Sequence, residues 1–218
     1  MRLLKYIFVF FLLATISACD KDKPVVTTTA SGSNSQEILN ANFENWDTAN
    51  VPVNWTLMSN GENANQSTES YSGAYAVVIW KWYFYGNQIL LNGSLTSFGA
   101  SQIIKAGTPI SFKPIQLSGF YKYQDVAPLG DTAKVVVLLK KYDTVQNKID
   151  TVGYGMKLLG PVNAYSPFQV DITDVQLGVT PDSIVIAFFA STSSKMCDES
   201  INGSNNCSYL YIDALSLK

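Results

Sequence analysis

Short hydrophobic runs, separated by turn-forming residues, follow one another along most of this chain. They predict strands over residues 74–85, 115–123, 133–139, 168–172, 183–189 and 208–217. Asn-Gly, Ser-Gly and Pro-Asp pairs lie between the runs, as is typical of turns. No window keeps a helical period, although residues 88–106 fit one helical turn. The pattern therefore predicts an all-β chain.

Many short strands joined by loops of uneven length favour one antiparallel β-sandwich over residues 37–218, with a jelly-roll-like topology. The run 133–139 is apolar on both faces, which suits the centre of a sandwich. A first strand over 42–46 would carry Phe43 inward. In the last strand the alternation places Ile212 and Ala214 on one face, and on the other Tyr209, Tyr211, Asp213, Leu215 and Leu217. No internal repeat of propeller length is found. We therefore predict a single domain.

The N-terminus has a different pattern, with Arg2 and Lys5 ahead of an apolar run at 6–14. This run is too short to span a bilayer, and residues 1–18 are typical of a secretory signal peptide. The ending at 16–19 resembles the lipobox of bacterial lipoproteins, which implies cleavage before Cys19 and its lipidation. We expect a membrane anchor at Cys19, a flexible tether over 19–36 and an outer-membrane lipoprotein facing the cell surface or the periplasm. The alternative is an ordinary signal peptide with an unrelated cysteine.

Charge and composition exclude several functions. Removing Arg2 and Lys5 from the 15 basic residues leaves 13 against 17 acidic residues, a net charge near −4. Such a domain has no basic field, so nucleic acid is not an expected partner. The chain also has no histidine, which excludes Ser-His-Asp and Cys-His catalysis and histidine-ligated metals.

Two further cysteines, Cys197 and Cys207, flank a polar, turn-rich stretch. In an oxidising compartment we expect them to form a disulfide. A redox or metal pair is the alternative, but the spacing is not CxxC and no third soft ligand follows.

The start and end of the predicted domain resemble jelly-roll carbohydrate-binding modules. The likeness rests on the stretches 42–46, 52–55, 72–76 and 211–213. Those modules often hold a structural calcium ion between the first and last strands, and their two acidic ligands match Glu44 and Asp213 here. Oxygen-only ligation suits Ca²⁺. The alternative is that both are ordinary hydrogen-bonded carboxylates.

A second resemblance covers about residues 38–218. The stretch 106–123, the Gly-Asp at 130–131, the Pro-Asp at 181–182 and the end at 211–213 are similar to a carbohydrate-metabolism domain of bacterial surface lipoproteins. This resemblance implies a β-sandwich associated with glycans. It carries over no catalytic residues.

Exposed aromatic rings are the side chains that stack on sugars, while neighbouring amides bind sugar hydroxyls. Two clusters of aromatic residues are candidates for carbohydrate binding. The first contains Trp80, Trp82, Tyr83 and Tyr85, and the second contains Tyr121 and Tyr123. For any one of these rings, burial in the core is the simpler alternative.

The sequence thus favours a carbohydrate-binding lipoprotein that performs no chemistry. A glycan-active hydrolase or lyase is a second hypothesis; its carboxylates would include Glu62 and Glu69 from a polar loop. A structural or adhesion subunit that binds another surface protein is a third, and it predicts a contiguous exposed apolar patch.

Overall fold

The structure is a computed structural model. It describes residues 38–58, 65–82, 86–93, 107–125, 130–194 and 206–218. Within these ranges the regular elements are strands, and no helix there has the length and hydropathy needed to cross a membrane.

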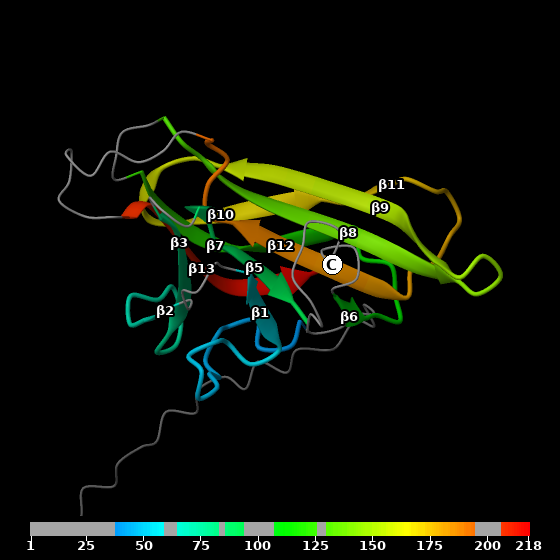
Figure 1. The fold of residues 1–218 in the computed structure, drawn as a ribbon, viewed down its shortest axis with the longest axis horizontal. Helices are drawn as coiled ribbons and strands as arrows, with labels where there is room; N and C mark the ends of the chain where they lie inside the picture. Colours follow the sequence, from blue (N-terminus) through cyan, green and yellow to red (C-terminus); the bar gives the residue numbers. More distant parts are fainter. Residues whose placement is uncertain (1–37, 59–64, 83–85, 94–106, 126–129, 195–205) are drawn as a thin grey trace, which may run out of the picture. The chain divides into compact units, whose positions relative to one another are not determined.

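The first sheet has seven strands, and its main path runs β1-β5-β12-β8-β9-β11. Its longest strands, β8 and β9, lie side by side with β12 in Figure 1. The seven strands are β1 (Trp55–Met58), β5 (Ile89–Asn92), β6 (Thr108–Pro109), β8 (Ala133–Asp143), β9 (Lys148–Leu159), β11 (Thr173–Asp174) and β12 (Ser183–Phe189).

The second sheet has six strands, in the order β10-β7-β13-β3-β2, with β4 paired to β3. All its pairings are antiparallel. The strands are β2 (Asn65–Ser67), β3 (Ala76–Trp82), β4 (Gly86–Asn87), β7 (Gln116–Asp125), β10 (Val162–Asp171) and β13 (Asn206–Leu217).

The two sheets share one hydrophobic core. Alternate residues of each strand point into it because successive side chains of a strand lie on opposite faces. Ile79 of β3, Leu210 of β13 and Val137 of β8 are fully buried members of this core. The all-β sandwich predicted from the hydrophobic runs is confirmed.

Two predicted elements differ from the structure. In the part of 88–106 that the structure describes, residues 89–92 form strand β5 rather than a helical turn, because they pair with β1 and β12. The segment before β1 was expected to hold a first strand around Phe43. It instead forms turns and one isolated bridge, Trp46 to Pro52, and Phe43 is buried with a positive φ of 53°.

A bulge near the end of β13 changes which residues face the core. The register with β7 shifts between Asp213 and Ser216, and Ala214 has a φ of 51°. An extra residue in one strand reverses the alternation beyond it. Leu215 and Leu217 are therefore in the core. The sequence pattern placed them on the same face as Tyr209 and Tyr211, and this prediction was wrong.

Candidate functional site

A groove of about 420 Å³ lies over the second sheet, along β2, β3 and β13. It combines aromatic rings with short polar side chains. The lining residues are Asn65, Gln66, Ser67, Thr68, Val78, Trp80, Tyr209 and Tyr211. Such a mixture of apolar surface and convergent hydrogen-bonding groups is typical of a small-molecule or sugar site.

The strand register brings these side chains together. Tyr211 of β13 lies between Lys122 of β7 and Val78 of β3, and Val78 pairs with Asn65 of β2. One step along, Tyr209 pairs with Trp80. Since Leu210 and Ile212 face the core, the alternation directs both tyrosines to the outer face.

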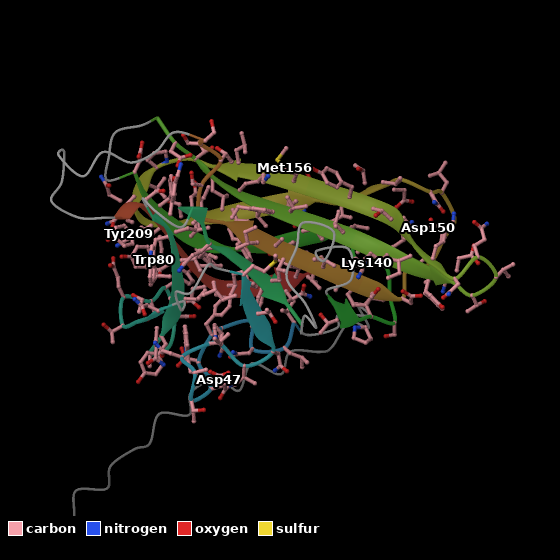
Figure 2. All side chains as sticks on the ribbon, in the orientation of Figure 1. Asp47, Trp80, Lys140, Asp150, Met156 and Tyr209 are labelled. Carbon is pink, nitrogen blue, oxygen red and sulfur yellow. The ribbon has the colours of Figure 1, made fainter. Side chains whose placement is uncertain are left out.

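The aromatic floor of the groove is formed by neighbouring rings. The centroids of Trp80 and Tyr209 lie 6.5 Å apart at an interplanar angle of 49°, and Figure 2 shows the two residues next to each other. Trp80 is only 6% exposed, whereas Tyr209 and Tyr211 are half-buried. The two tyrosines therefore offer more ring surface to a ligand than the tryptophan.

A buried lysine lies at the edge of the aromatic floor. The Lys122 ammonium is 4.3 Å from the centroid of the Tyr211 ring and forms an ion pair with Glu69. The Lys122 side chain is 4% exposed and that of Glu69 57%. Burying an ammonium is costly unless it is paired, so Glu69 and the ring compensate the charge at this point.

The hydroxyls beside this ion pair remain protonated. Burial, then the nearby Glu69 and Tyr209, raise the pKa of Tyr211. Burial, then the Asp213 and Glu69 carboxylates, raise the pKa of Tyr165 strongly. Both phenols are therefore neutral hydrogen-bonding groups at any physiological pH.

The connection from β2 to β3, residues 68–75, borders the groove and contributes Thr68 to its lining. The Tyr71 ring is stacked on Phe120 of β7, with centroids 3.4 Å apart and planes at 10°. The Tyr165 hydroxyl of β10 donates a 2.8 Å hydrogen bond to the Glu69 carbonyl. This wall loop, as we call residues 68–75, therefore contacts strands well beyond its own hairpin.

Two carboxylates hold the backbone of the wall loop. Asp213 Oδ2 accepts hydrogen bonds from the N–H groups of Tyr71 and Ser72, both at 2.9 Å. Glu44 Oε1 accepts from Ala74 and Tyr75 at 3.0 and 3.1 Å. The sequence singled out Glu44 and Asp213 as a pair, and the structure brings them to the same loop.

Gly73 lies between the two pairs of N–H donors and has a φ of +70°. A Cβ at this position would collide with the Glu44 carboxylate. The loop therefore needs glycine here for both its conformation and its close approach to Glu44.

Asp213 is fully buried. Burial, and more weakly the charge of Glu44, raise its pKa, although the N–H groups of Ser72, Ala214 and Tyr71 oppose this shift. The calcium expected from the sequence would use these two carboxylates as ligands. Calcium takes six to eight oxygen ligands, and the described residues contain no cluster of three or more His, Cys, Asp or Glu side chains. Backbone carbonyls would have to supply the rest, and calcium stays a prediction.

Among the predicted ligand-binding aromatics, Trp80 lines the groove. Tyr121 and Tyr123 were expected on an exposed face, but they lie on the inner face of β7, 9% and 0% exposed. They pair with Ile212 and Leu210 of β13, which also face the core. The backbone of Trp82 and Cys207 belongs to β3 and β13, but their side chains are not among those described. Outside the described residues lie Tyr83, Tyr85, Cys19 and Cys197.

Sequence reasoning missed most of the groove. It named Tyr209 and Tyr211 as one face of the last strand without assigning them to a binding site. Their alternation with Leu210 and Ile212 was the available signal. The roles of Tyr71 and Glu69 depend on how residues 68–75 fold over the sheet, which no local pattern predicts.

Among the residues that the structure describes, the groove lacks the paired carboxylates of a glycosidase centre. That chemistry needs two carboxyl groups on opposite sides of one glycosidic bond. The described lining of the groove contains no carboxylate, and neighbouring Glu69 is engaged by Lys122. Glu62 lies outside the described residues.

A separate hollow of about 280 Å³ is mainly apolar, lined by side chains such as Ile38, Ile110 and Ile184. Its buried amide, Asn92, bonds to Thr108 Oγ1, the Ile184 carbonyl and the Ile186 N–H. The groove on the second sheet is therefore the better candidate for recognising a polar ligand.

Comparison with known proteins shows the fold but not a family. No protein-family model matches the chain, and no curated protein matches it. A candidate glycoside hydrolase from Bacteroides thetaiotaomicron has a similar structure, with a TM-score of 0.54 and 15% identity. The match covers 71% of this chain and 56% of that one, so the chain spans little more than half of that protein.

Two further solved structures are similar at lower scores. The family 11 carbohydrate-binding module of the cellulase Lic26A-Cel5E from Clostridium thermocellum has a TM-score of 0.43 and 12% identity, over 86% of this chain and 95% of that one. The K2 cleaved adhesin domain of Lys-gingipain has a TM-score of 0.46 and 12% identity, over 84% and 98%. Membership of the lipoprotein domain family stays a prediction.

Proposed function

We propose that this protein binds a neutral glycan in the groove on its second sheet. The observation that carries the proposal is the composition of that groove. Two half-buried tyrosines lie beside a row of amide and hydroxyl side chains from β2 and the wall loop. Sugar C–H groups pack against the rings, while Asn65, Gln66 and Ser67 exchange hydrogen bonds with sugar hydroxyls.

The charge of the site favours a neutral ligand. Among the residues that the structure describes, Lys122 carries the positive charge next to the groove. Its ammonium group is already paired with Glu69 and lies over the Tyr211 ring. An acidic sugar would need an uncompensated cation to offset the loss of its hydration. We therefore expect neutral hexose or pentose polymers to bind better than uronate-containing or sulfated ones.

A glycan array tests the proposal, with hits measured by calorimetry. The domain carrying Tyr211→Ala should lose most of its affinity, since it loses ring surface and a hydroxyl. Tyr154→Ala is the matched control, because Tyr154 is an exposed tyrosine of the other sheet. A folded protein that binds no glycan, or equal effects of the two substitutions, would contradict the proposal. Release of reducing ends from a bound glycan would instead favour the enzyme hypothesis.

We propose that Cys19 anchors the domain to a membrane, so that glycan is captured near the cell surface. The support is the sequence at 16–19, which resembles a lipobox. Cells expressing the full chain should incorporate an alkyne-labelled fatty acid into it, and Cys19→Ala should abolish the label. Equal labelling of both proteins would contradict the anchor.

We also propose that Glu44 and Asp213 hold a structural Ca²⁺, together with backbone carbonyls. The support is the juxtaposition of two carboxylates, one of them fully buried. A bound cation would stabilise the folded protein by mass action. Calcium should therefore raise the melting temperature of the wild type and leave Asp213→Asn unchanged. No calcium effect on the wild type would contradict this proposal and leave the glycan groove untouched.

One observation favours a second function, contact with another surface protein. Tyr154, Met156 and Leu158 on the outer face of the first sheet are 41%, 47% and 52% exposed. Tyr154 and Met156 pair with Leu138 and Val136 of β8, so the apolar surface continues onto a second strand at these two positions. Apolar patches of this kind mark interaction sites.

Cross-linking the anchored protein in its own cells tests this second function. A specific cross-linked species should form with the wild type and be lost in a Met156→Lys, Leu158→Lys variant. A blank glycan array together with this result would make protein contact the better account.

A further inference from the structure

The wall loop extends over the second sheet rather than remaining at its own hairpin. It begins after β2 and ends before β3, yet Tyr71 is stacked on Phe120 of β7 and lies 6.2 Å from the Tyr165 ring of β10. Its backbone is bonded to Asp213 of β13, which lies between β7 and β3. Residues 68–75 thus reach three strands of the sheet beyond their own hairpin, namely β7, β10 and β13.

The same loop supplies one side chain to the groove and places others beside it. Thr68 belongs to the lining, and Glu69 pairs with Lys122 beside Tyr211. The Tyr71 ring is 48% exposed although one face is covered by Phe120. The position of the loop therefore decides where Thr68 lines the groove and where Glu69 compensates the charge of Lys122 beside Tyr211.

Backbone hydrogen bonds to two distant carboxylates hold the loop in place. Four of its N–H groups donate to Asp213 or Glu44. Neither of these carboxylates lines the groove. Hydrogen bonds to ionised acceptors are stronger than those between neutral groups, and loops without such ties are the least stable parts of a fold.

We infer that Asp213 and Glu44 are positioning residues for the glycan groove. Through the loop backbone they set the position of Thr68 and of the Glu69–Lys122 pair beside Tyr211, and so set the affinity for glycan without touching it. This inference rests on the proposed function of the groove. It adds a dependence of glycan binding on two residues that were singled out as metal ligands, and it holds whether or not a cation is present.

Asp213→Asn tests the inference with little change of shape. Asp213 accepts N–H groups on both carboxylate oxygens, from Tyr71 and Ser72 on Oδ2 and from Ala214 on Oδ1. An asparagine has one acceptor oxygen, so its amide nitrogen must face a donor on one side. We expect glycan affinity to fall at least about tenfold.

A spectroscopic readout separates positioning from general destabilisation. In the wild type, the Phe120 ring current should shift the NMR signals of the stacked Tyr71 ring. In Asp213→Asn this shift should disappear, while the core methyl signals of Val77 and Ile79 stay in place. Glu44→Gln is the milder second variant, since Glu44 is only partly buried, and it should change both readouts in the same direction.

Asp131→Asn is the matched control. Asp131 is 3% exposed and also accepts backbone N–H groups, from Thr132 and Ser193. These hydrogen bonds hold segments other than residues 68–75. The Asp131→Asn substitution should therefore leave glycan affinity and the Tyr71 signal unchanged. All variants are measured with calcium and with chelator, so that a cation effect is seen separately.

The outcomes for the inference and for the proposed function are distinct. If wild-type protein binds no glycan, the proposed function fails, and a Tyr71 signal that survives both substitutions overturns positioning as well. If Asp213→Asn and Glu44→Gln displace Tyr71 while glycan affinity stays within about twofold, the inference is overturned and the groove remains the glycan site.

Discussion

Two pairs of tyrosines with the same spacing lie on adjacent strands of this protein and face opposite sides of one sheet. Tyr121 and Tyr123 on β7 point into the core, 9% and 0% exposed. Tyr209 and Tyr211 on β13 point outward and line the groove. The strands pair so that Tyr211 is opposite Lys122, and Tyr121 is opposite Ile212.

The contrast shows that the ladder register, not residue type or spacing, decides whether a ring becomes core or binding surface. A shift of one residue would exchange the two sets, because side chains alternate with period two. In β13 the core positions are held by Leu210 and Ile212. In β7 the two tyrosines themselves hold them, and the outward position between them is taken by the paired Lys122.

Truncating the inner tyrosine should have the largest effect on stability. Tyr123→Ala removes a fully buried ring and should lower the free energy of unfolding by about 3–5 kcal/mol. Urea denaturation measures this change. Tyr123→Phe, which keeps the ring, should cost less than about 1.5 kcal/mol. A loss below about 1 kcal/mol for the alanine variant would contradict the inner position of this ring.

Truncating an outer tyrosine should give the opposite result. Tyr209→Ala should weaken glycan binding about tenfold, which is about 1.4 kcal/mol, while unfolding changes by about 1 kcal/mol or less. Calorimetry and urea denaturation on the same variant separate the two quantities. Should Tyr209→Ala unfold the protein without altering affinity in the folded fraction, the two faces would have been assigned the wrong way round.

Salt should have little effect on glycan affinity. The cation beside the groove is buried and paired with Glu69, and a neutral ligand has no charge to be screened. Between about 0.05 and about 0.5 M salt, which strongly changes the Debye length, the dissociation constant should vary less than about twofold. A tenfold weakening of binding over the same range would indicate an anionic ligand and would contradict a groove that favours neutral glycans.

The smallest predicted effect concerns alkaline pH. Burial raises the pKa of Tyr165 in the folded protein, so the phenol binds its proton more tightly there than in the unfolded chain. The stability this contributes is complete below the unfolded pKa, near 10, and is lost as pH rises through the folded value. Urea denaturation from pH 8 to 11 should show the decline.

Tyr165→Phe isolates this contribution, because other groups titrate in the same range. The lowered pKa values of Lys81 and Lys140 act in the opposite direction. The difference in unfolding free energy between wild type and Tyr165→Phe should shrink above about pH 10. A difference that is constant or grows would mean that Tyr165 is not protected by burial.

The sequence was sufficient for the fold class and for several strands, but it did not predict β1 or the long strand β9. Runs such as 133–139 and 183–189 became β8 and β12, because continuous apolar segments suit the interior of a sandwich. The sequence did not predict which residues of β7 face the core, because Phe120, Tyr121 and Tyr123 are all aromatic and no alternation of polar and apolar residues is visible there. The bulge near Asp213 also has no local sequence signal, since Ala214 is an unusual residue for a positive φ.

The candidate site was predicted only in part. Trp80 was named and lines the groove, and Glu44 and Asp213 were paired through a resemblance and do meet at one loop. The wall loop itself depends on contacts between residues more than a hundred positions apart, such as Tyr71 with Asp213. Contacts of that range are set by the complete fold and leave no periodic pattern in a single chain.

The most direct test of the account is NMR mapping of glycan binding on aromatic and amide signals of the domain. We predict that titration with a neutral glycan from the array shifts the signals of Trp80, Tyr209, Tyr211 and Asn65. Tyr154 and Met156, which are exposed on the other sheet and do not line the groove, should not move; Figure 2 shows Met156 well apart from Trp80 and Tyr209. Shifts centred on Tyr154 and Met156, with the groove signals unchanged, would contradict the assignment of the glycan site.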